Sequence, residues 1–176
     1  MKSFLLKVLF LSATFFLFSA CQEKGLAGDI NQLEDNCSRT LKKAKAFEQP
    51  VFPIDSAKEY LSIMMPYFES FDKASLKVLV ELANTEKASR KVNLDPSKLI
   101  EDLSFSQKQI SALYQELKSD SLSREKSSEY FKKEQTIYYQ LKLKSDGMYD
   151  SSNRLKSNFD RLLPKAKHLA DSLRAL

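Results

Sequence analysis

Few side chains in this 176-residue sequence have the type and spacing that catalysis requires. His168 is the only histidine and has no second ligand at helical spacing, so no metal centre is predicted. Ser70 and Ser123 each precede a lysine by three positions, as nucleophilic serines do in penicillin-binding enzymes. Both matches are expected by chance because serine and lysine are abundant, and the companion motifs are missing. With too few glycines for a phosphate-binding loop, the sequence predicts no enzymatic activity.

One cysteine, Cys21, directly follows a segment with the three zones of an export signal. Residues 1–7 carry two lysines, residues 8–18 form an apolar run of 11 residues, and Ser19 and Ala20 are small. A membrane-spanning helix needs about 20 apolar residues. The segment 4–20 has only 17 and includes a lysine. We therefore predict a signal peptide over residues 1–20.

The stretch Phe18-Ser19-Ala20-Cys21 resembles the lipobox of bacterial lipoprotein precursors, in which a large apolar and two small residues precede an obligatory cysteine. Phe18 also disfavours ordinary secretory cleavage, which prefers a small side chain three residues before the cut. The resemblance implies that signal peptidase II cuts before Cys21, that the thiol carries diacylglycerol and that the new amino group is acylated. No other cofactor is predicted. Gln22 implies the outer rather than the inner membrane, with the membrane face left open.

The second cysteine, Cys37, lies on an apolar helical stripe with Ile30, Leu33, Leu41 and Ala44. A free cysteine in such a stripe is typically a small buried side chain. If Cys21 is lipidated, Cys37 has no partner within the chain for a disulfide. We predict that Cys37 is a buried residue without a chemical role.

Composition and charge indicate an all-α protein that does not bind nucleic acid. Three glycines and few turn dipeptides disfavour sheets, which need frequent tight turns. The net charge is +5. Residues 21–130 hold 16 basic and 18 acidic side chains, whereas residues 131–176 hold 10 and 5. Because these bases alternate with acidic and apolar positions, they indicate a solvated helix face, with contact to an anionic envelope surface as the alternative.

After a lipidated tether over residues 21–28, we predict one helical domain over residues 29–176. The first helix is expected from Asp29 to about Phe47, followed by an extended connection. A second helix is expected from a capping box at Ser56 to about residue 92, with a bend at Pro66. Asp95 is expected to cap a third helix that has Pro96 in its first turn and ends near Leu117.

The last third of the chain carries a coiled-coil-like seam, in which apolar residues recur every seven positions. Its members are Leu141, Met148, Leu155, Leu162, Leu169 and Leu176, with Phe159, Ala166 and Leu173 between them. A bend or break is expected at Gly147 or Pro164. The unequal helix lengths predict an elongated antiparallel bundle of four or five helices with a long C-terminal helix, its seam packed on the chain's own helices.

Methionine and aromatic side chains gather in two places, where they either fill the core or line a cleft. The candidate cleft residues are Met64, Met65, Tyr67, Phe68, Tyr138 and Tyr139. The function predicted first is a lipid-anchored envelope protein that binds another envelope protein or cell-wall polymer. The alternative is a carrier for a hydrophobic small molecule or lipid in that cleft. The sequence leaves the oligomeric state open.

Overall fold

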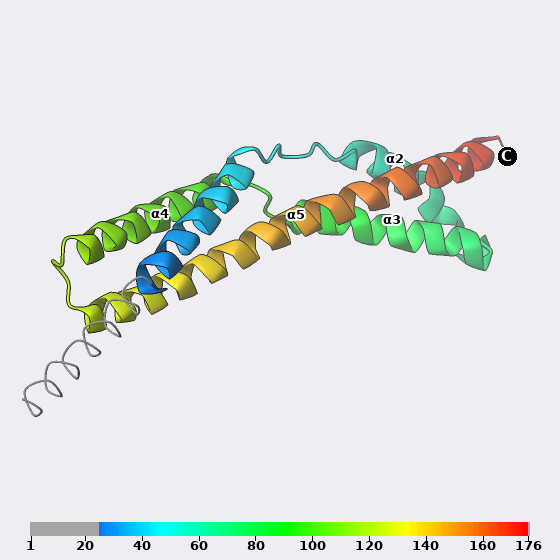
Figure 1. The fold of residues 1–176 in the computed structure, drawn as a ribbon. Coiled ribbons are helices and arrows are strands. Elements are labelled where there is room, and N and C mark those ends of the chain that lie inside the picture. Colours follow the sequence, from blue (N-terminus) through cyan, green and yellow to red (C-terminus); the bar gives the residue numbers. More distant parts are fainter. Residues whose placement is uncertain (1–24, 176) are drawn as a thin grey trace, which may run out of the picture. The chain divides into compact units, whose positions relative to one another are not determined.

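The computed structural model describes residues 25–175, and these form helices joined by short connections, with no strand among them (Figure 1). An N-terminal helix occupies residues 25–45. It is followed by α2 (Ile54–Met64), the 3-10 helix η1 (Met65–Ser70), α3 (Lys73–Lys91), α4 (Ser97–Lys118) and α5 (Arg124–Arg174). The predicted all-α bundle with a long C-terminal helix is confirmed. None of the helices within residues 25–175 is both long and apolar enough to cross a membrane.

The chain divides into two compact units that share α5. Within the described residues, unit 1 contains 25–47 and 96–145, and unit 2 contains 48–95 and 146–175. The N-terminal 22 residues of α5 thus belong to unit 1 and the remainder to unit 2. The boundaries expected at residues 20 and 28, and the single domain after them, stay predictions.

In unit 1, α4 runs antiparallel to α5, because Lys98 and Lys144 line one groove while Glu116 and Tyr130 line the next. The N-terminal helix runs in the same direction as α5 and packs on both helices. Its predicted stripe is buried throughout. The core of unit 1 consists of Ile30, Leu33, Cys37, Leu41, Ala44, Leu99, Leu103, Ile110, Leu113, Tyr138 and Leu141.

In unit 2, α3 runs antiparallel to α5. The shorter α2 packs along α5 and runs in the same direction as α5. Phe52, in the connection before α2, stacks on Phe159 of α5 with ring centroids 5.6 Å apart. The core of unit 2 consists of Ala57, Met64, Leu79, Leu82, Phe159, Leu162 and Ala166. The seam of α5 is therefore covered by the chain's own helices in this unit, as predicted.

Pro66 interrupts the expected second helix, because α2 ends at Met64 and η1 has Pro66 in its first turn. The expectation of one bent helix to about residue 92 is wrong, because Phe71 is extended and α3 begins as a separate helix at Lys73. Three expected helix starts differ from the structure. The N-terminal helix already includes residues 25–28, although two of them are glycines. Both glycines are exposed, and no other part of the chain packs against them. The capping box at Ser56 is wrong, because α2 begins at Ile54 with Pro53 as its N-cap. The N-cap of α4 is Pro96 rather than Asp95.

Of the bend or break expected in α5 at Gly147 or Pro164, the break is wrong, because the helix is continuous through both residues. Proline removes one backbone hydrogen bond from a helix interior. Leu162 and Ala166, on either side of Pro164, are both buried in the core of unit 2. Their burial stabilises the helix on both sides of the proline, so that it continues despite the missing bond.

Candidate functional site

A groove between α4 and α5 in unit 1 is the best candidate for a functional site. Its volume is about 630 Å³. Phe105 of α4 and Ile137 of α5 both line it and remain 64% and 44% exposed. Leu141 of the core closes its floor. Exposed large apolar side chains that adjoin one another on a hollow surface are typical of an interaction site.

Helical spacing explains why Phe105 faces the groove. The buried residues Leu99, Leu103 and Ile110 form the face of α4 that turns to the core. Phe105 lies two positions after Leu103, and residues two apart in a helix do not share a face. The same holds for Ile137, which directly precedes the buried Tyr138. Neither side chain is needed to fill the core, so both are available to a partner.

Charged side chains form the rim of the groove. Lys98 pairs with Glu101 at 3.2 Å and with Asp102 at 3.1 Å, and hydrogen bonds to Asp102 and then Glu101 raise the pKa of this lysine. Lys108 and Lys144 also line the groove, and neither forms a hydrogen bond or ion pair with any residue from 25 to 175. Three lysines and two carboxylates therefore leave the rim with one surplus positive charge, and Lys108 and Lys144 are the lysines that are not paired.

The chemistry of the groove is suited to binding rather than to catalysis. The one hydroxyl in its lining belongs to Ser104, which donates to the carbonyl oxygen of Ile100 at 2.7 Å. No histidine or cysteine lines the groove to activate that hydroxyl. Among residues 25–175 there is also no group of three or more side chains arranged to hold a metal ion.

The six predicted cleft residues do not all belong to one unit. Met64 is fully buried in the core of unit 2, whereas Met65, Tyr67 and Phe68 are exposed on η1. Tyr138 and Tyr139 belong to unit 1. Tyr138 is buried and shares a hydrogen bond of 3.1 Å with the Thr40 hydroxyl. Tyr139 is exposed and lines a groove beside the N-terminal helix. A cleft made by these residues stays a prediction.

The other predicted sites have different outcomes. Phe18, Ser19, Ala20 and Cys21 lie outside the described residues. Cys37 is buried as predicted, its thiol donating to the carbonyl oxygen of Leu103 at 3.6 Å. Burial raises the pKa of this thiol to about 11, which suppresses the reactive thiolate.

Sequence reasoning missed Phe105 and Ile137. The signal was present in the helical stripe of α4, since Phe105 falls off the face defined by Leu99, Leu103 and Ile110. A large apolar side chain off the buried face of its helix is either covered by another element or a partner, or it stays exposed.

Comparison with known proteins shows no matching family model, no matching curated protein and no matching solved structure.

Proposed function

We propose that this chain is a lipid-anchored cell-envelope protein that acts by binding another envelope protein and has no enzymatic activity. The anchor is supported by the lipobox-like sequence that ends at Cys21. A single lipid chain binds a membrane only marginally, but two or three chains give durable attachment. The outer membrane is the favoured location because Gln22 follows the cysteine.

The observation that supports a binding function is the exposed apolar pair of Phe105 and Ile137 in the α4–α5 groove. Two antiparallel helices with a groove between them offer parallel ridges on which a third helix can lie. Amphipathic helices bind such grooves through apolar residues spaced by three or four positions. The partner proposed is therefore a helix with one apolar face.

The charged residues at the rim of the groove indicate which charges the partner helix should carry beside its apolar face. Lys108 and Lys144 form no ion pair with any described residue. Acidic residues beside the apolar face of the partner would complement both lysines and exclude basic competitors. An amphipathic helix with acidic flanks thus fits the groove better than a polymer with only polar groups.

Photo-crosslinking in the native membrane tests this proposal. A photoreactive phenylalanine analogue at position 137 should capture one protein, and peptide mapping should place the crosslink in an acidic amphipathic helix. The same analogue at position 143 is the matched control, because Leu143 lies on the same helix, is 71% exposed and does not line the groove.

A synthetic peptide of the captured helix should then bind the purified protein. Phe105→Ala should weaken that binding by about tenfold or more, as expected for loss of an aromatic anchor. Lys108→Glu and Lys144→Glu should weaken it through charge repulsion. Equal crosslinking from both positions, or capture of wall polymer or a second copy of this chain alone, would contradict a partner helix in this groove.

The lipid anchor is tested separately. Cells that make the wild-type chain should incorporate labelled palmitate into it, and Cys21→Ser should abolish the label. The denatured wild-type protein should titrate as one free thiol, that of Cys37, because the other would be alkylated. Two titratable thiols in the mature protein would show that Cys21 is unmodified.

A further inference from the structure

A second groove, in unit 2, is lined mainly by basic side chains. It lies between the start of α3 and the last third of α5 and has a volume of about 390 Å³. Four basic side chains line it: Lys77, Arg161, Lys165 and His168. They come from two helices that meet antiparallel, so their convergence is a product of tertiary packing.

One carboxylate lies among these bases. Glu81 forms an ion pair with Arg161, whose terminal nitrogen lies 2.8 Å from Oε2, and another with Lys77 at 3.8 Å. Arg161 is the main cause that lowers the pKa of Glu81, and the charges of Lys77 and Lys165 add to its effect. Three full positive charges against one negative charge leave the groove at +2 without His168. The groove therefore has a surplus of positive charge after its internal pairing.

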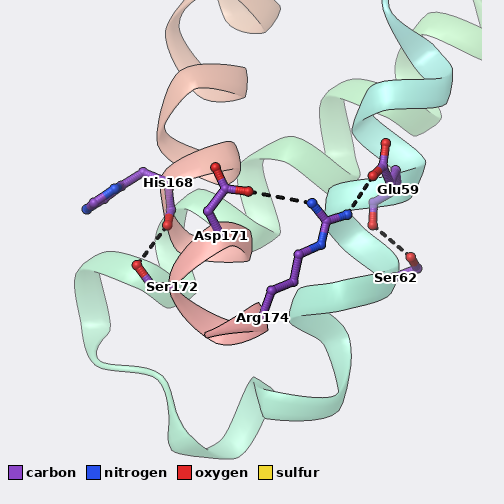
Figure 2. A network of polar contacts seen from close by, with 6 residues as sticks. All are labelled: Glu59, Ser62, His168, Asp171, Ser172 and Arg174. Carbon is purple, nitrogen blue, oxygen red and sulfur yellow. Dashed lines mark hydrogen bonds and ion pairs between the residues drawn. The ribbon is translucent and has the colours of Figure 1, made fainter. Parts of the chain in front are cut away.

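Donors for a ligand remain available. Within residues 25–175, Lys165 and the His168 imidazole form no hydrogen bond or ion pair. Figure 2 shows that the His168 ring points away from the neighbouring network, to which it contributes only its carbonyl oxygen as acceptor for Ser172 at 2.9 Å. In that network Arg174 forms ion pairs with Glu59 and Asp171, and the His168 imidazole takes no part in it.

The floor of the groove is apolar. Val78 of α3 and Leu169 of α5 are partly buried against the core of unit 2 and line the groove beside the cations. A ligand that fits must therefore combine an anionic group with an apolar portion. The volume corresponds to a small ligand, such as a headgroup with a few carbons.

We propose that the α3–α5 groove binds a phosphate group attached to an apolar chain. A phosphate group offers two free acceptor oxygens as a diester and three as a monoester, and Arg161, Lys165 and His168 line the groove as donors to them. Its charge matches the surplus of the groove. Val78 and Leu169 would contact the first carbons of the chain. This site is distinct from the α4–α5 groove, since it lies in the other unit.

Calorimetric titration of the full protein, purified in a neutral detergent, tests the proposal with four probes. Dihexanoyl-phosphatidylglycerol and hexyl phosphate carry the proposed chemistry as a lipid headgroup and as a free phosphate ester. Inorganic phosphate lacks the apolar chain, and dihexanoyl-phosphatidylcholine lacks the net charge. Saturable binding of the first probe alone identifies a lipid headgroup, and tighter binding of hexyl phosphate identifies a soluble ester. Equal binding of all four, or of none, overturns the proposal.

Variants place the binding in this groove. Lys165→Gln and His168→Gln should each weaken the better ligand by about fivefold, as expected for loss of one donor to phosphate. Lys167→Gln is the matched control, because it removes the same charge from the same helix at an exposed position outside the lining. All three side chains are exposed, so folding should be unaffected. Equal weakening by Lys165→Gln and Lys167→Gln would show general charge attraction and overturn the site.

Discussion

Glu86 is a buried residue, 4% exposed, and its carboxylate forms an ion pair with Arg90 one helical turn further along α3. The Arg90 Nε lies 2.8 Å from Oε1, and its terminal nitrogen donates to Oε2 at 2.8 Å. The planar guanidinium thus meets both carboxylate oxygens, Oε2 through a hydrogen bond and Oε1 through an ion pair only, which the single ammonium of a lysine could not do in this geometry. The pair lets unit 2 enclose a charge beside Thr85 and Ser89.

Removing Arg90 should therefore destabilise the protein. Arg90→Ala leaves Glu86 buried without its partner, and we expect a loss of about 1–3 kcal/mol in the free energy of unfolding, measured by urea denaturation. Lys91→Ala is the matched control, since it removes an exposed charge from the same last turn of α3. Adding Glu86→Leu to Arg90→Ala should recover part of the loss. Equal effects of Arg90→Ala and Lys91→Ala would mean that the pair adds nothing to stability.

Charge introduced into the seam of α5 should be severely destabilising. Leu155 and Leu162 are both buried, so Leu155→Asp or Leu162→Asp places an unpaired carboxylate in the core. The expected loss is about 3 kcal/mol or more, read from thermal and urea unfolding. Leu143→Asp makes the same change on the same helix at an exposed position and should have a small effect. An unchanged melting temperature for Leu155→Asp would place the seam in solvent.

The Cys37 thiol should be protected in the folded protein. Burial raises its pKa to about 11 from an ordinary value of 9.0. Each pKa unit reduces the thiolate fraction tenfold, so labelling by iodoacetamide at pH 8 should slow by about 100-fold relative to protein in urea. Peptide mapping distinguishes Cys37 from Cys21. Ser38→Cys with Cys37→Ala supplies an exposed thiol at the next position, which should label rapidly. Fast labelling of native Cys37 would show that this helix opens readily.

Glu134 should make stability depend on pH with a defined sign. Burial raises the pKa of this carboxyl above its ordinary value of 4.5, and its Oε2 atom is buried without a hydrogen-bond partner. The folded state therefore binds a proton more tightly than the unfolded state does. The cost of the charged form is absent below pH 4.5 and fully present above the raised folded pKa.

Glu134→Gln removes that cost. The variant should be more stable than wild type at pH 7 and equal to it at pH 4, as measured by urea denaturation at the two pH values. Glu129→Gln is the control on the same helix, because Lys133 lowers the pKa of Glu129 and the charged form is favoured there. A stabilisation by Glu134→Gln that persists at pH 4 would exclude ionisation as its cause.

The seam of α5 illustrates how far sequence reasoning extends. Its positions Leu141, Met148, Leu155 and Leu162 were predicted and are all buried. The alternate positions were predicted only where they are apolar, at Phe159, Ala166 and Leu173, of which the first two are buried and the third is partly buried. In the middle of the helix these positions are Ser145 and Ser152, which are also buried and continue the same alternation of three and four residues. Because serine is ordinarily exposed, the residue type gave no indication that these two positions belong to the buried seam.

Local properties were determined by the sequence alone. Helical periodicity, the end of α2 before Pro66 and the buried stripe that contains Cys37 depend on residues a few positions apart. The tertiary structure decided which faces remain uncovered and which charges meet. The pairing of Glu81 with Arg161 joins residues 80 positions apart, and the exposure of Phe105 and Ile137 depends on where the N-terminal helix packs. Periodicity states which face of a helix is apolar, but the helix that covers that face is chosen by packing between distant segments.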